Sequence, residues 1–154
     1  MPERKSIEDF LAQRHLAFVG VSRDTKQFAN TIYRRLRSDG RTLYPVNAAA
    51  GGNSIEGDHC YGDLAEVPDP VDGVVVMVGA EAAATVVRQA VERGIPRVWL
   101  HHGVGRGSVT EEAVQVCRDN GIAVVDGACP LMFEEPVRGI HRLHGLLASR
   151  RIAS

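Results

Sequence analysis

The chain has 154 residues, of which 44% are hydrophobic and 24% charged, and this composition is typical of one globular domain. The formal net charge of −1 gives the whole chain no electrostatic attraction to nucleic acid. No apolar run approaches the ~20 residues that span a membrane, and the N-terminal segment lacks a signal peptide's apolar core. Three cysteines without tight spacing favour reduced thiols. We therefore expect a cytoplasmic protein that binds neither nucleic acid nor membranes.

The N-terminal third of the chain alternates helix-like and strand-like segments. Ser6 is placed to cap a short first helix. Residues 16–21 are apolar and rich in β-forming side chains, which predicts a buried strand. Residues 30–38 place apolar side chains at helical spacing, and Gly40 follows where a helix commonly ends. Residues 42–46 predict a second strand.

The middle of the chain contains an irregular segment and then a strong strand pattern. Residues 48–61 are rich in glycine, and we expect them to be irregular with one short strand around Ile55. Residues 71–78 form a nearly continuous β-branched run, which is typical of a central parallel strand covered on both faces. Residues 81–93 predict a helix that ends at Gly94.

The C-terminal third continues the alternation. Residues 97–100 predict a strand, and Thr110 is placed to cap a helix that runs to Asn120. Residues 122–125 predict the last strand of the sheet. Pro136 can open a further helix, which carries several arginines and leucines.

Strands that alternate with helices of this length predict a Rossmann-like, doubly wound α/β fold with a mostly parallel sheet and helices on both faces. We expect residues 1–133 to form this domain and residues 134–154 to form a helical tail, packed on the domain or at a subunit contact. In such sheets ligands bind beyond the carboxyl ends of the strands. The loops at that edge are predicted at Ser22–Asn30, Asn47–Gly52, Gly79–Glu81, His101–Gly107 and Asp126–Pro130.

The first of these loops has the residues of a phosphate site. Gly20 ends a strand that leads into a helix, and a helix start offers free backbone N–H groups and a partial positive charge. Arg23 and Lys26 add cations, Ser22 adds a hydroxyl, and Asn30 adds an amide in the first turn of the helix. The simpler alternative is an ordinary strand-to-helix turn with two surface cations.

The loop is not a dinucleotide fingerprint, because the positions that would need glycine after Gly20 hold Ser22 and Thr25. An NAD enzyme also places an acidic residue near the end of the second strand, where this chain has Val46 and Asn47. A neutral residue there tolerates a phosphorylated ribose. Both NADP and coenzyme A (CoA) carry one, so the residues leave these two ligands open.

Several segments together resemble the stand-alone CoA-binding domain proteins, a family related to the N-terminal domain of the succinyl-CoA synthetase α-subunit. The resemblance covers roughly residues 5–133. The residues that carry it are Leu16–Asp24, Lys26, Asn30, Tyr44–Asn47, Ile55–Gly57, Tyr61, Leu64, Glu66–Asp72, Val98–Leu100, Gly103, Val104, Asp126, Cys129 and Pro130.

This resemblance implies a CoA-binding Rossmann fold. To the diphosphate and ribose phosphate it assigns Gly20, Val21, Ser22, Arg23 and Lys26. It places Val46 and Asn47 along the nucleotide, and it places Val78, Gly79 and Ala80 against the adenine or pantetheine. The family has prolines where this chain has Ala48, Gly79 and Ala80, which leaves a softer and shallower wall for the ligand.

Other reactive residues have simpler interpretations. His101 and His102 follow a buried strand at the ligand edge, and we interpret them as polar strand-end residues rather than an acid–base pair. Cys129 can be a small buried residue or can form a mixed disulfide with CoA. No Cys or His spacing matches a zinc motif, so we predict neither a metal site nor catalytic residues.

The sequence thus predicts non-catalytic binding of CoA or acyl-CoA at the carboxyl edge of a parallel sheet. One alternative is an NADP-linked oxidoreductase, which the missing glycines disfavour. Another is a regulatory partner of an acyl-CoA synthetase. A homodimer through the C-terminal tail is also left open.

Overall fold

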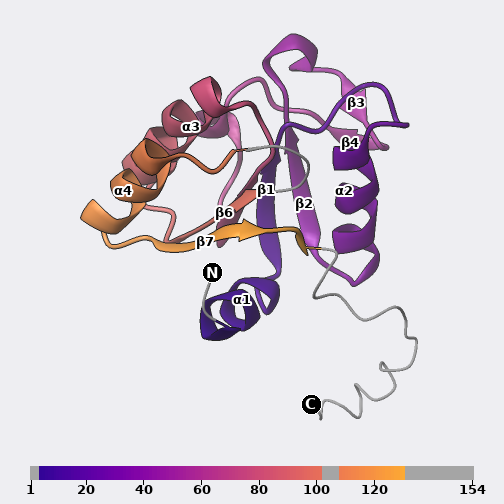
Figure 1. Cartoon of the computed structure of the whole chain (residues 1–154). Coiled ribbons are helices and arrows are strands. Elements are labelled where there is room, and N and C mark those ends of the chain that lie inside the picture. Colours follow the sequence, from indigo (N-terminus) through magenta and orange to yellow (C-terminus); the bar gives the residue numbers. More distant parts are fainter. Residues whose placement is uncertain (1–3, 102–107, 131–154) are drawn as a thin grey trace, which may run out of the picture.

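The computed structural model describes residues 4–101 and 108–130, which form a five-stranded parallel sheet between two layers of helices (Figure 1). Every neighbouring pair in the sheet is parallel. This arrangement confirms the predicted Rossmann-like α/β fold. The strands lie in the order β2 (Thr42–Val46), β1 (His15–Val19), β5 (Gly73–Val76), β6 (Arg97–His101) and β7 (Ala123–Ala128).

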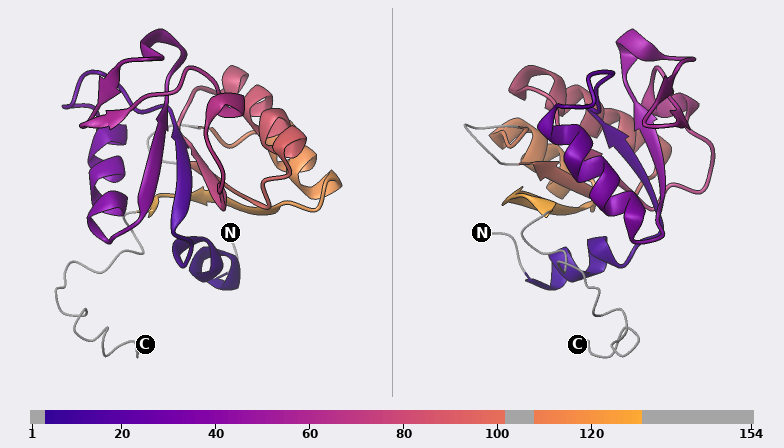
Figure 2. Two further views of the ribbon diagram at one scale, coloured as in Figure 1. Left: turned by 180° about the vertical axis from the view of Figure 1, so that it is seen from behind. Right: turned by 90° about the vertical axis from the view of Figure 1, so that its right-hand side faces the viewer.

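The helices cover both faces of the sheet (Figure 2). Buried side chains of α1 (Arg4–Leu11) and α2 (Phe28–Ser38) share one core, and those of α3 (Ala80–Arg93) and α4 (Glu111–Asp119) share the other. Successive strand residues enter opposite cores because side chains alternate along a strand: Phe18 packs with α2, whereas Val19 packs with α3.

The core under α1 and α2 contains the large aromatic side chains. Phe10 meets Trp99 edge to face with ring centroids 5.3 Å apart, and Phe18 meets Tyr33 in the same way at 5.5 Å. Trp99 is fully buried, and its indole Nε1 donates a hydrogen bond to the carbonyl of Ala128 at 3.0 Å. The opposite core is mainly aliphatic.

The strand order places a topological switch between β1 and β5. From β1 the chain moves outward to β2, and it then returns to add β5 on the other side of β1. The connections that leave the carboxyl ends of β1 and β5 therefore diverge. Such a switch point is the usual ligand position in open parallel sheets.

Several expected boundaries differ from the structure. Ser6 is the third residue of α1 and so does not cap it, and α2 begins two residues earlier than predicted, at Phe28. The irregular segment contains two short strands, β3 (Ser54–Ile55) and β4 (Asp58–His59), which pair with each other as an antiparallel hairpin. The central strand β5 is shorter than its β-branched pattern, because apolar residues continue into the loop beyond the ladder.

Two predicted helix boundaries are confirmed by their geometry. Gly94 ends α3 in the left-handed conformation at φ +72°, which glycine adopts without steric cost. Thr110 caps α4, and its side chain accepts a hydrogen bond from the amide of Ala113 at 3.0 Å. Single turns of 3-10 helix occupy Ala48–Ala50 and Leu64–Glu66. Among the described residues no helix is long and apolar enough to cross a membrane, and the predicted tail 134–154 lies outside them.

Candidate ligand-binding site

Gly20 allows three strand ends to meet at the switch point. Its φ is +116°, and a Cβ built on it would lie 2.2 Å from the carbonyl oxygen of Met77. Its amide donates to the carbonyl of Val46 at 3.3 Å, and the amide of Met77 donates to Val19 at 2.8 Å. Any side chain at position 20 would separate β1 from β5, so this glycine is required by backbone packing as well as by backbone conformation.

The loop that follows is organised by Asp24. The Asp24 carboxylate accepts hydrogen bonds from the Lys26 amide at 3.1 Å and from Gln27 Nε2 at 3.2 Å. The Asp24 amide in turn donates to Ser22 Oγ at 3.0 Å. This compact turn leaves Arg23 and Lys26 exposed, and neither forms an ion pair with another described residue. Two cations therefore stand free at the start of α2.

The start of α2 has no side-chain cap from the part of the chain that the structure describes. Gln27 occupies the cap position without a side-chain hydrogen bond, and the first turn contains no acidic residue. The first amides of a helix need acceptors and carry a partial positive charge. An anion at this position would receive backbone N–H groups together with the side chains of Arg23 and Lys26.

Some predicted site residues shape the loop rather than face a ligand. Asn30 is fully buried, and its side-chain oxygen and nitrogen both form hydrogen bonds with the backbone of Ser22. Asn47 donates to the carbonyl of Val21 at 2.9 Å and accepts from the amide of Ala49 at 2.8 Å. The side chain of Val21 is buried in the α1–α2 core. That of Val46, 4% exposed, lies in the opposite core.

The loop after β5 is held by a residue that the sequence did not indicate. Ser108 Oγ donates to the carbonyl of Val78 at 2.6 Å and accepts from its amide at 2.9 Å. Ser108 is fully buried, and its own amide donates to the carbonyl of His101. Beyond this clasp Gly79 is exposed, and a Cβ built on it would meet nothing within 4 Å. Ala80, at the start of α3, is half-buried.

The sequence did not indicate Phe28 as a site residue either. It is the first residue of α2 and is 52% exposed, the one large hydrophobic side chain so exposed among the described residues. Its ring centroid lies 6.0 Å from that of His101, at the end of β6. An exposed aromatic surface thus adjoins the uncapped helix start. The sequence-predicted His102 lies outside the described residues.

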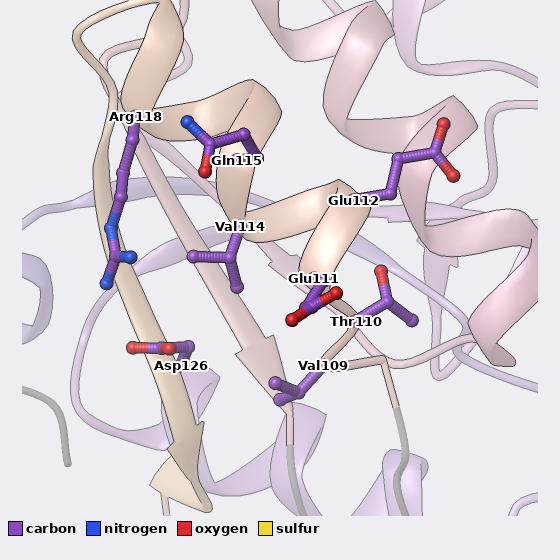
Figure 3. Close-up of a pocket in the computed structure, with 8 residues that line it drawn as sticks. All are labelled: Val109, Thr110, Glu111, Glu112, Val114, Gln115, Arg118 and Asp126. Carbon is purple, nitrogen blue, oxygen red and sulfur yellow. The ribbon is translucent and has the colours of Figure 1, made fainter.

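A hollow in the described surface lies elsewhere, between α4 and the edge strand β7 (Figure 3). Its volume is about 750 Å³. Its lining carries three carboxylates against one guanidinium, which disfavours a polyphosphate. None of the predicted site residues lines it. The lining residues are Val109, Thr110, Glu111, Glu112, Val114, Gln115, Arg118 and Asp126.

The cysteines are buried and none is bonded to another. Burial raises the pKa of the Cys117 thiol to about 12 and, to a smaller extent, the pKa of Cys60 above its ordinary value. Raised pKa values keep both thiols protonated and weakly nucleophilic at neutral pH. Within residues 4–101 and 108–130, no group of three or more His, Cys, Asp or Glu is placed to hold a metal ion.

Comparison with known proteins identifies the family to which the chain belongs. The family model of the CoA binding domain matches residues 14–135. Acetate–CoA ligase [ADP-forming] I of Archaeoglobus fulgidus is 24% identical over 120 residues, which are 74% of this chain and 17% of the ligase. The chain therefore spans about a sixth of the length of that curated relative.

Solved structures agree with the sequence match. A conserved hypothetical protein from Pyrococcus furiosus is 30% identical with a TM-score of 0.71, over 79% of this chain and 100% of that one. The dinucleotide-forming acetyl-coenzyme A synthetase 1 of Ca. Korarchaeum cryptofilum, in complex with phosphate and ADP, is 27% identical with a TM-score of 0.65, over 79% of this chain and 27% of that one. A Pyrococcus horikoshii protein, 24% identical over 86% and 92% of the two chains, shares the fold with a TM-score of 0.77. By its sequence match and its fold, the chain belongs to the CoA binding domain family.

Proposed function

We propose that the chain binds CoA or an acyl-CoA at the carboxyl edge of its sheet and catalyses no reaction on it. The observation that carries the proposal is the uncapped start of α2 beside Arg23 and Lys26, at the switch point of a CoA binding domain. Phosphate groups bind to cations and to backbone amides that have no hydrogen-bond acceptor, and this corner supplies both.

The ligand would be oriented by its two chemically different ends. The diphosphate would lie on the amides at the start of α2, with Arg23 and Lys26 beside it and beside the ribose phosphate. The exposed ring of Phe28 offers apolar contact to the adenine or to the pantetheine arm. Beyond the end of β5, the open space at Gly79 admits ligand atoms close to the backbone.

Isothermal titration calorimetry of the full chain tests the proposal with CoA, dephospho-CoA and NADPH. We expect CoA to bind and dephospho-CoA to bind about tenfold more weakly, because it lacks the ribose phosphate that the cations would pair with. Native mass spectrometry of the freshly purified protein would weigh any ligand that it retains. Absence of CoA binding, or displacement of CoA by a lower concentration of NADPH, would overturn the proposal.

A further inference from the structure

Glu56 has a backbone conformation that glutamate rarely adopts. It lies in the two-residue turn between β3 and β4, where its φ is +53° and that of the following Gly57 is +83°. Among the described residues, Glu56 is the one non-glycine residue with positive φ. Asparagine, aspartate or glycine is usual at such a turn position, because longer side chains crowd the backbone there. Glutamate is therefore an unusual residue at this position.

The carboxylate of Glu56 is turned toward α2, and its side chain is only 7% exposed. Its Oε2 accepts hydrogen bonds from Arg34 Nη1 at 2.6 Å and from Asn30 Nδ2 at 2.9 Å. Both partners belong to α2, so the tip of the hairpin is fastened to the beginning of that helix. The ion pair with Arg34 balances the buried negative charge.

Asn30 connects Glu56 to the candidate ligand-binding loop. Its Oδ1 accepts from the amide of Ser22 at 2.9 Å, and its Nδ2 donates to the carbonyl of Ser22 at 2.7 Å as well as to Glu56. One amide group thus holds both backbone groups of the residue at which the loop begins. The next residue is Arg23, one of the two cations of the site.

Glu56 and the backbone of Ser22 favour the same orientation of the Asn30 amide. An asparagine amide has two similar orientations, which exchange its acceptor oxygen for its N–H donors. An ionised carboxylate accepts hydrogen bonds and donates none, so Glu56 is compatible only with the orientation that turns Nδ2 toward it. The same orientation presents Oδ1 to the amide of Ser22. The reversed orientation would set donor against donor at Ser22 and oxygen against oxygen at Glu56.

We propose that Glu56 is a positioning residue, which fixes the orientation of Asn30 and through it the conformation of the Ser22–Gln27 loop that receives the ligand. It touches no ligand itself. The β3–β4 hairpin then serves as the support of the site rather than as a separate surface structure. The identity of the ligand rests on the proposed function, whereas the effect of Glu56 on the loop does not.

The test replaces Glu56 by methionine, which keeps the length of the side chain and removes the acceptor. We expect Glu56→Met to speed hydrogen exchange of the Ser22 amide, measured by NMR, by at least about tenfold, and to raise the Kd for CoA by about fivefold or more. Glu56→Gln keeps one oxygen for Asn30. For that variant we expect both quantities to return to within about threefold of the unmodified protein.

Asp58 supplies the matched control, because it lies in the same hairpin and binds α2 without touching Asn30. Its carboxylate accepts from the Tyr33 hydroxyl at 2.5 Å and from Arg37 Nη1 at 2.8 Å. We expect Asp58→Asn to lower the melting temperature but to leave exchange at Ser22 and the Kd for CoA within about twofold.

The outcomes separate the two proposals. If Glu56→Met leaves Ser22 exchange unchanged, or if Asp58→Asn accelerates it as much, Glu56 does not position the loop. If the unmodified protein binds no CoA, the proposed function fails, and the exchange measurements still decide the role of Glu56. A failure of Glu56→Gln to restore slow exchange would show that charge, rather than the acceptor, is what matters, and would contradict the orientation argument.

Discussion

The helices α2 and α4 both begin at the carboxyl edge of the sheet, yet their first turns are opposite in chemistry. At α4 the side chain of Thr110 accepts from the Ala113 amide, and Glu111 and Glu112 complement the positive end of the helix. At α2 the cap residue makes no such bond, the first turn contains no acidic residue, and two cations stand nearby. The chain thus supplies a side-chain acceptor to the start of α4 but none at the cap position of α2.

The charges of the surrounding segments extend this difference. Between Arg14 and Arg41 there are seven arginines and lysines and two aspartates, whereas residues 108–130 contain four acidic residues and one arginine. The two segments therefore differ in the sign of their charge although the net charge of the chain is close to zero. An anionic ligand would be attracted to the free cations of the α2 corner and repelled from the carboxylates of the hollow between α4 and β7.

The largest expected effect is at the backbone approach that brings the α2 corner together. Gly20→Ser would place a Cβ 2.2 Å from the Met77 carbonyl oxygen at a φ of +116°, and we expect the free energy of unfolding to fall by about 3 kcal/mol or more. Urea denaturation measures this change. The same substitution at Gly79, where a Cβ meets nothing within 4 Å, should change the free energy by less than about 0.5 kcal/mol. Equal losses at the two positions would contradict the packing argument.

The next effect concerns the cations at the start of α2. Changing Arg23 and Lys26 together to Ala should raise the Kd for CoA at least about tenfold, because two charged contacts with phosphate are lost. Calorimetry at two salt concentrations should also show a weaker dependence on salt. As a control at the other helix start, Glu111→Gln with Glu112→Gln should leave the Kd within about twofold. An unchanged Kd in the variant that lacks Arg23 and Lys26 would show that CoA does not bind at this corner.

A smaller effect comes from exchanging the capping chemistry of the two helices. Thr110→Ala removes the cap of α4 and should lower the free energy of unfolding by about 1 kcal/mol without altering CoA affinity. Gln27→Ser gives α2 a cap, which should add about 0.5 kcal/mol and raise the Kd for CoA by about threefold, because the new hydroxyl competes with phosphate for the same amides. Tighter binding by Gln27→Ser would show that these amides do not hold the ligand.

The smallest effect appears only at alkaline pH and concerns the α4 side. Burial raises the pKa of Cys117 to about 12 from 9.0, so between these values the folded protein keeps a proton that the unfolded chain releases. This contribution to stability is complete below pH 9 and is lost as the pH rises toward 12. Denaturation curves from pH 8 to pH 11 should show a shallower decline for Cys117→Ala than for the unmodified protein. Parallel declines would mean that the thiol does not titrate as its burial implies.

Local pattern in the sequence was enough for most of the helices and for the strands of the main sheet. Continuous apolar runs located the buried strands, Gly94 and Thr110 marked helix ends, and Gly20 marked the close approach of β1 and β5, beside which Arg23 and Lys26 form the candidate phosphate corner. These signals are readable because they depend on residues within one or two turns of one another.

The tertiary structure alone decided how distant residues meet at that corner. Phe28 has the helical spacing of the buried Ile32 and Leu36, yet its side chain is 52% exposed. The approach of Glu56 to Asn30 spans 26 residues, and that of Ser108 to Val78 spans 30. Such contacts follow from the order of the strands and from the return of the hairpin onto α2. No local period encodes them, because they arise only when separate elements pack together.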